Sequence, residues 1–193
     1  MKRLIVGISG ATGAIYGIRT LEVLKRDPKV EVHLIVSEAA ALTVKAETPF
    51  KLEEVIRLAD FAYEISDIGA VISSGSFQHD GMVIAPCSIK TMAMISNSIN
   101  SNLMVRAADV TLKEKRRLVL LIRETPLHLG HLRLLTNLAE IGAMIHLPVP
   151  AFYHNPQTLD DIINQTVGKT LDSFGINHNL FKRWQGLTSH KAR

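Results

Sequence analysis

Four charged residues surround one apolar run in the second half of the chain. Arg106 and Lys113 stand seven apart in a helical pattern, about two turns, so both project from one face. This helix leads into the run LVLLI, which ends on Arg123 and Glu124. In a parallel α/β sheet, ligands bind at the carboxyl ends of strands. Three cations and a carboxylate converging there predict an anionic, phosphorylated ligand.

A second interpretation fits the same spacing. Asp109 lies three residues after Arg106 and four before Lys113, which is the spacing of a surface ion ladder. Such a ladder adds only tenths of a kcal/mol to stability. Spacing alone therefore leaves the ladder and the ligand site equally open.

Alternating strands and helices must position these residues. Five aliphatic runs, none of them cleanly alternating, predict strands buried on both faces at 4–8, 30–36, 82–85, 118–122 and 143–147. Helical patterns cover about 13–26, 38–46, 88–98, 103–115, 128–141 and 158–174. The alternation predicts a doubly wound parallel sheet in a single domain over 1–184. Residues 59–80 read as a long excursion with a short strand, and 185–193 as a polar C-terminal tail.

Composition narrows the function classes. Hydrophobic residues make up 47% and aromatic residues 5%, so the core of this 193-residue chain is aliphatic. The net charge is +4, and the scattered basic residues without interleaved aromatics argue against a nucleic-acid partner. One cysteine excludes an internal disulfide and fits a reducing compartment. No leader pattern and no apolar stretch near ~20 residues is found, so we expect a cytoplasmic protein with no membrane segment.

The first strand runs into a glycine-rich turn, Gly7 to Gly13. Closely spaced glycines let the backbone approach a ligand, and the following helix N-terminus presents free N–H groups, so phosphate binding is expected. A nicotinamide dinucleotide site is the alternative. Ser9 stands where its middle glycine belongs, however, and the second strand ends on Ser37 rather than an acidic residue, which disfavours that reading.

A second polar turn follows the run at 82–85. Ser88 and Thr91 offer hydroxyls beside the N–H groups of a starting helix. They are suited to a ligand, but for this turn taken singly helix capping alone is the favoured explanation.

Taken together, these segments resemble a known family. SGATGAIYG, APCSIKT, RAADVTLKE, LVLLIRETP, NLAEIGA, PAFYHNPQT and KRW occur in the order seen in the flavin prenyltransferases of the UbiX family, also known as phenolic or aromatic acid decarboxylase subunits. The resemblance runs from the first strand to Trp184. A sister group, the flavin-dependent cysteine decarboxylases, carries an asparagine where this chain has Lys90, and that departure argues against the sister chemistry.

The resemblance implies a Rossmann-like or flavodoxin-like fold and an FMN-binding homo-oligomer, often a dodecamer. Such an enzyme transfers a dimethylallyl group from dimethylallyl monophosphate to N5 and C6 of reduced FMN without a metal. Its prenylated FMN serves a separate UbiD-type decarboxylase. Two other functions remain open: an FMN-dependent aromatic acid decarboxylase and a non-catalytic flavin carrier.

The resemblance also implies residue roles. The flavin-binding positions are Gly10, Ala11, Thr12, Ser37, Ser88, Ile89, Lys90, Thr91 and Arg123. Thr12 replaces a common serine, and its added methyl group could crowd the prenyl group. Glu47 would act with the Thr12 hydroxyl in proton transfer near N5, provided that burial raises its pKa.

The donor-phosphate positions are Arg106, Lys113, Glu124, Tyr153 and Lys169. Cations there stabilise the charge that develops as the allylic C–O bond breaks. Lys169 replaces an arginine and loses its bidentate geometry. Glu124 would donate a proton to the departing phosphate, although the neighbouring cations oppose its protonation.

Three further residues complete the expectations. Trp184 would place its ring beside the allyl group and stabilise cationic character. Cys87 lacks an identifiable base and is expected to be a small buried residue rather than a nucleophile. His128 and His131 lack further ligands, so no metal site is expected.

Overall fold

A six-stranded parallel sheet forms the centre of the molecule. The structure is a computed structural model and describes residues 1–186. The strands are β1 (Lys2–Ile8), β2 (Val30–Val36), β3 (Phe61–Tyr63), β4 (Gly81–Cys87), β5 (Arg117–Ile122) and β6 (Met144–His146). Their order across the sheet is β3-β2-β1-β4-β5-β6, and every neighbouring pair is parallel. The expected doubly wound sheet is confirmed.

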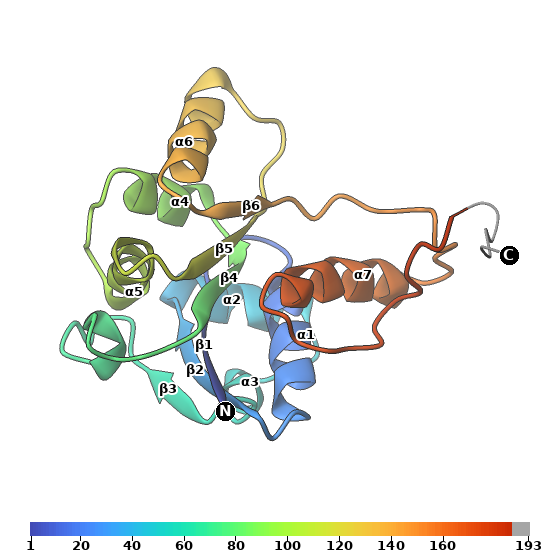
Figure 1. Cartoon of the computed structure of the whole chain (residues 1–193), viewed down its shortest axis with the longest axis horizontal. Coiled ribbons are helices and arrows are strands. Elements are labelled where there is room, and N and C mark those ends of the chain that lie inside the picture. Colours follow the sequence, from blue (N-terminus) through green and yellow to red (C-terminus); the bar gives the residue numbers. More distant parts are fainter. Residues whose placement is uncertain (187–193) are drawn as a thin grey trace, which may run out of the picture.

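Helices cover both faces of this sheet (Figure 1). The helices are α1 (Ala14–Lys25), α2 (Glu38–Glu47), α3 (Leu52–Ile56), α4 (Ile89–Ser96), α5 (Leu103–Lys113), α6 (Leu129–Glu140) and α7 (Leu159–Asp172), with a 3₁₀ turn at Val71–Ser73. One apolar core joins the sheet to α1, α2, α3 and α7, and the other joins it to α4, α5 and α6. The two cores explain why the central strands are apolar on both faces.

Alternation along β1 separates the two cores. Leu4, Val6 and Ile8 pack in the first core, while Ile5 packs in the second. All four are fully buried, as expected for successive residues that point to opposite faces of a sheet.

The sequence pattern locates the strands well and their ends less well. Each of the five aliphatic runs overlaps a strand, and the short strand expected within 59–80 is β3. The helix α3 was not predicted, because its five residues span little more than one turn. β4 continues through Cys87, so the segment from Ala85 to Cys87 belongs to the strand rather than to the turn after it.

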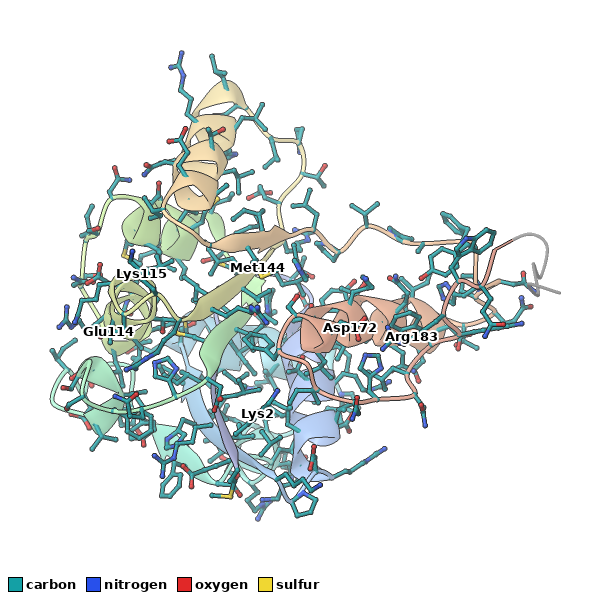
Figure 2. The ribbon with its side chains drawn as sticks, in the orientation of Figure 1. Lys2, Glu114, Lys115, Met144, Asp172 and Arg183 are labelled. Atoms are coloured by element: carbon teal, nitrogen blue, oxygen red, sulfur yellow. The ribbon has the colours of Figure 1, made fainter. Side chains whose placement is uncertain are left out.

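Two segments extend away from the compact body. Figure 1 shows α6 projecting from the sheet, and the segment between β6 and α7 running out to meet the C-terminal part of the chain. Large apolar side chains are exposed along that connecting segment, including Val149 (65%) and Phe152 (74%). The segment after α7 returns along the same helix, as Figure 2 shows for Asp172 and Arg183.

Among residues 1–186, no helix has the length and apolar character needed to cross a membrane. The predicted polar tail at 185–193 lies outside the described residues from 187 onward.

Candidate functional site

A cleft lies at the carboxyl edge of the sheet, where the connections of β1 and β4 diverge. Its volume is about 530 Å³. It is lined from the ends of five strands and from the start of α5 by Gly10, Ser37, Glu38, Ala39, Ile65, Ser88, Ile89, Lys90, Thr91, Met94, Asn102 and Glu124. In doubly wound sheets this crevice at the change of strand order is the position where ligands bind.

The turn after β1 forms one wall of the cleft. Gly10 lies so close to α2 that a side chain on it would overlap the Cβ atom of Ala39, so this position requires glycine. Ser9 is 1% exposed; its hydroxyl donates to the Pro86 carbonyl at 2.9 Å and accepts from the Ser88 N–H at 2.8 Å. Ser9, which stands where a dinucleotide site has its middle glycine, therefore connects the two turns that form the cleft.

Glu47 meets the same turn from the end of α2. Its Oε2 accepts a hydrogen bond from the Gly13 N–H at 2.8 Å, and Gly13 follows Thr12 directly. The structure thus brings Glu47 to the Thr12 segment, as the proposed pairing requires. The carboxylate is exposed in this chain, however, so the burial expected for Glu47 is not present here.

Two serines begin the helices beside the cleft. Ser37 Oγ accepts from the Ala40 N–H at 3.1 Å, and Ser88 Oγ accepts from the Thr91 N–H at 3.3 Å. The Ser88 hydroxyl also donates to Thr91 Oγ1 at 3.1 Å. Capping, the simpler reading, is therefore correct for Ser88. Because these serines and Thr91 also line the cleft, they can serve a ligand as well.

The end of β5 contributes Arg123 and Glu124. The Arg123 N–H donates to the Cys87 carbonyl at 3.2 Å, which fixes the strand end beside the turn after β4. Burial raises the pKa of the Tyr16 phenol, and the positive charge of Arg123 opposes that rise. Glu124 lines the cleft, and its Oε1 accepts from the Thr125 N–H at 3.0 Å.

Within residues 1–186, neither Arg106 nor Lys113 pairs with Glu124. Arg106 pairs with Asp109 at 3.1 Å and donates through Nε to the Ser73 carbonyl at 3.1 Å. Lys113 pairs with Glu114 rather than with Asp109, so only half of the predicted ladder forms.

The geometry of α5 explains this difference. Lys113 ends α5 just before β5 begins, whereas Glu124 follows the end of β5. A six-residue strand spans about 20 Å, so Lys113 lies at the opposite edge of the sheet. The expectation that all these charges converge on one strand end within a single chain is wrong.

Tyr153 and Trp184 meet on the extended side of the molecule, and Lys169 lies on α7. The rings of Tyr153 and Trp184 are 5.9 Å apart in an edge-to-face arrangement, and both residues are exposed. Lys169 projects from the last turn of α7 and is also exposed. None of the three lines the cleft of their own chain.

Two residues that resemble functional groups have structural roles. Cys87 is fully buried at the end of β4, and burial raises the pKa of its thiol. The expectation of a small buried residue is confirmed. His128 begins α6, and its Nδ1 accepts from the Gly130 N–H at 3.0 Å.

The composition of the cleft fits a flavin mononucleotide. Hydroxyls and free N–H groups at the start of α4 suit phosphate and ribityl oxygens, and Lys90 adds a positive charge. Ile65 and Met94 offer apolar surface for an aromatic ring. Sequence reasoning missed both, because Ile65 follows β3 outside any motif and Met94 lies in α4 beyond the motif that ends at Thr91. Asn102 was also missed, although its position before an apolar helix is a capping signal.

Comparisons with known proteins identify the family of the chain. A family model described as Flavoprotein matches residues 1–171. The chain is 62% identical over 188 residues to the flavin prenyltransferase UbiX of Escherichia coli strain K12, covering 96% of this chain and 100% of that protein. The UbiX of Thauera aromatica is 57% identical over 184 residues, covering 95% of this chain and 94% of that protein.

A solved structure shows the same fold with ligands. AnUbiX (PadA1) in complex with FMN and dimethylallyl pyrophosphate matches with a TM-score of 0.94 and 46% identity, covering 97% of this chain and 99% of that one. A dodecameric FMN-dependent UbiX-like decarboxylase from Escherichia coli O157:H7 matches with a TM-score of 0.94 and 47% identity, covering 95% of this chain and 100% of that one. The chain therefore belongs to the flavin prenyltransferases of the UbiX family.

Proposed function

We propose that the chain transfers a dimethylallyl group from dimethylallyl monophosphate to N5 and C6 of reduced FMN. One observation carries this proposal. The cleft at the change of strand order is lined by helix N-termini, hydroxyls and apolar side chains, and the chain that forms it is 62% identical to a flavin prenyltransferase. When bound, reduced FMN supplies the nucleophilic atoms that the allyl group alkylates.

Residues 1–184 act in this proposal as one flavin-binding unit. Gly10, Ala11 and Thr12 approach the flavin through the turn after β1. Ser37 and the turn from Ser88 to Thr91 bind its polar side chain, since these groups line one cleft. Arg123 supplies a positive charge at the end of β5, where its guanidinium compensates the flavin phosphate.

Thr12 and Glu47 act as the proton-transfer pair. The contact of Glu47 with the Gly13 N–H holds the carboxylate beside the Thr12 segment. A carboxylate there can accept the proton released as N5 is alkylated. We expect a second subunit or the bound flavin to cover Glu47, which is exposed in the single chain.

Cations bind the donor phosphate and stabilise it as it leaves. Lys113 lies too far from Glu124 to reach it within one chain, and Arg106 is paired with Asp109, so we assign both to the site of a neighbouring copy. Tyr153 and Lys169 bind the same phosphate, and a lysine at that position supplies charge without a bidentate fork. This arrangement requires a homo-oligomer, and the dodecamer of a 47% identical relative makes a dodecamer the expected form.

Glu124 and Trp184 act on the allyl group and its leaving phosphate. Glu124 lies in the cleft and donates a proton to the departing phosphate. The exposed ring of Trp184 stabilises cationic character on the allyl carbons once a neighbouring copy completes the site. The product leaves for a UbiD-type decarboxylase, and the reduced, buried thiol of Cys87 fits activity in the cytoplasm.

An aromatic acid decarboxylase is the second candidate, favoured by the decarboxylase name of the dodecameric relative. One experiment separates the candidates: anaerobic incubation of the purified chain with reduced FMN and dimethylallyl monophosphate, followed by the mass of the flavin. A gain of one isoprenoid unit supports the prenyltransferase. An unchanged flavin mass refutes the prenyltransferase. In that case, carbon dioxide release from an aromatic acid without a partner protein supports the decarboxylase. Tight FMN binding with neither activity supports a flavin carrier.

A further inference from the structure

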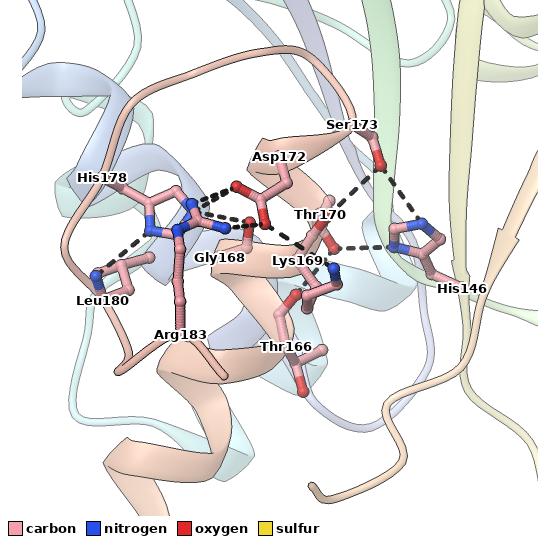
Figure 3. Close-up of polar contacts among 10 residues, drawn as sticks. All are labelled: His146, Thr166, Gly168, Lys169, Thr170, Asp172, Ser173, His178, Leu180 and Arg183. Atoms are coloured by element: carbon pink, nitrogen blue, oxygen red, sulfur yellow. Dashed lines mark hydrogen bonds and ion pairs between the residues drawn. The ribbon is translucent and has the colours of Figure 1, made fainter. Parts of the chain in front are cut away.

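The segment after α7, residues 173–186, lies against that helix and is called here the C-terminal strap (Figure 3). His178 is 2% exposed; its Nδ1 accepts from the Leu180 N–H at 3.3 Å, so Nε2 carries the proton and donates to the Gly168 carbonyl at 2.9 Å. Gly168 permits this approach, because a side chain there would overlap both His178 and Phe181. The strap therefore packs on a helix face shaped to receive it.

Asp172 is the residue that connects the strap to α7. Its two carboxylate oxygens accept from the two terminal nitrogens of Arg183 at 2.8 and 2.6 Å, which is a bidentate ion pair. Oδ1 also accepts from His178 Nε2 at 3.1 Å, and Lys169 Nζ lies 3.9 Å from Oδ2 (Figure 3). One carboxylate thus contacts the middle of the strap at His178, its later part at Arg183, and a cation of its own helix.

Two of the donor-site residues depend on this carboxylate for their position. Arg183 directly precedes Trp184, so the bidentate pair fixes the backbone next to the tryptophan. Trp184 then meets Tyr153 edge-to-face at 5.9 Å. Lys169, one helical turn before Asp172, is held on the same side of α7. Tyr153, Lys169 and Trp184 come from three separate segments. Asp172 is connected to Lys169 directly, to Trp184 through Arg183, and to Tyr153 through Arg183 and Trp184.

Stability alone does not account for this arrangement. The Arg183 side chain is 55% exposed, and ion pairs at that exposure add little to folding. The bidentate fork instead fixes direction, because a guanidinium and a carboxylate that share two hydrogen bonds must lie in one plane. An exposed pair of this geometry is suited to orienting the chain that follows it.

We propose that Asp172 is a positioning residue for the dimethylallyl donor, holding Trp184 through Arg183 and Lys169 through charge. This inference rests on the proposed function, because the expected effect of changing Asp172 is slower use of the dimethylallyl donor. The alkylating step needs the allyl group aligned between flavin and tryptophan. Misplacing such a group by about 1 Å costs on the order of 100-fold in rate.

Asp172→Asn in the full-length assembled protein tests the proposal, since asparagine keeps the size but loses the charge. Asp160→Asn is the matched control: Asp160 lies on the same helix about three turns before Asp172 and pairs with Arg19 at 3.1 Å rather than with Arg183. We expect Asp172→Asn to lower kcat/KM for dimethylallyl monophosphate about 10- to 100-fold with FMN affinity and melting temperature unchanged. Asp160→Asn should match the parent protein.

The fluorescence of Trp184, the sole tryptophan, provides a readout without catalysis. Asp172→Asn should lower its anisotropy and increase its quenching by acrylamide, and Asp172→Glu should restore part of both. Arg183→Gln, a change at an exposed strap residue, should reproduce these effects, and the double variant should add little.

Two results would overturn the proposal: a Trp184 signal in Asp172→Asn equal to that in Asp160→Asn, or normal donor kinetics in both variants. If the parent protein leaves FMN unmodified, the proposed function fails; the fluorescence comparison still tests the positioning.

Discussion

At the residue scale, the buried hydroxyl of Ser9 connects the two turns that form the cleft. It donates to the Pro86 carbonyl and accepts from the Ser88 N–H, and the Ser88 side chain in turn begins α4. Leaving a buried N–H without an acceptor costs free energy of folding. Ser9 is therefore needed to accept from the Ser88 N–H, and not only to bind a ligand.

Ser9→Ala should therefore reduce both stability and flavin affinity. We expect a loss of about 1–3 kcal/mol in the free energy of unfolding, because the Ser88 N–H loses its acceptor. Urea unfolding and FMN titration measure the two effects. Ser76→Ala, at an exposed serine, is the control and should change stability by less than about 0.5 kcal/mol. Equal behaviour of the two variants would contradict the role of Ser9.

Glu47→Gln separates proton transfer from the structural role of the same side chain. The amide oxygen can still accept from the Gly13 N–H, so FMN affinity should remain within about twofold, whereas a lost base typically costs on the order of 100-fold in rate. Single-turnover prenylation measures this rate. Glu53→Gln on α3 serves as the control because its side chain is exposed and outside the cleft. Unaltered single-turnover kinetics in Glu47→Gln would exclude Glu47 as the base.

At the element scale, the direction of each helix decides which charges can meet. α5 runs back from the carboxyl edge, so Asn102 at its start lines the cleft while Lys113 at its end lies at the opposite edge. The helical spacing of Arg106 and Lys113 places both on one face of α5. The spacing cannot show at which edge of the sheet each residue lies, because helical periodicity carries no information about the neighbouring strands.

The same limit applies to other elements. The apolar runs predicted the central strands, since burial on both faces leaves a strong signal. The ends of the strands were predicted less accurately. In β4, the last residues Pro86 and Cys87 resemble a turn in sequence. Ile65, Met94 and the Ser9 bridge depend on contacts between distant segments, and a single sequence offers no pattern for them.

The strap should show a pH dependence set by Asp172. Hydrogen bonds from Arg183 lower the pKa of this carboxyl below 3.8, and His178 and Lys169 are the other charged or titratable groups that face it. A lowered pKa stabilises the docked strap at pH above the unfolded value, and this stability is lost as the pH falls through the folded pKa. We expect the Trp184 anisotropy to fall only below pH 3.8.

In Arg183→Gln, the pKa of Asp172 should move back toward 3.8, so the strap should be released at a higher pH. Circular dichroism followed in parallel distinguishes release of the strap from unfolding of the whole chain. An identical midpoint in the parent protein and in Arg183→Gln would contradict the assignment of this transition to Asp172.

At the scale of the whole molecule, one chain contains the flavin cleft and the proposed donor-binding residues at separate places. The flavin cleft contains Glu124, whereas Lys113 lies at the far edge of the sheet, and Tyr153 and Trp184 lie on the extended side. These parts can act together only if neighbouring copies bring the edge of one chain to the cleft of another.

Mixed assemblies test this arrangement. Lys113→Ala and Glu124→Gln should each reduce prenylation strongly when alone, and assemblies formed from both variant chains should regain activity, since some sites then receive both intact residues. Lys115→Ala mixed with Glu124→Gln is the control for assembly itself, because Lys115 follows α5 without joining the proposed site. Failure of the Lys113 and Glu124 variants to complement each other would place both residues in the site of one chain.

The most direct test of the central claim uses reduced FMN and a dimethylallyl monophosphate labelled with ¹³C at the carbons that form the new bonds. After anaerobic incubation with the assembled protein, the flavin is isolated and its ¹³C spectrum recorded. We predict one labelled carbon bonded to N5 and another bonded to C6, with release of inorganic phosphate. Recovery of unmodified FMN together with labelled dimethylallyl alcohol would contradict the account, because the cleft would then only hydrolyse the donor.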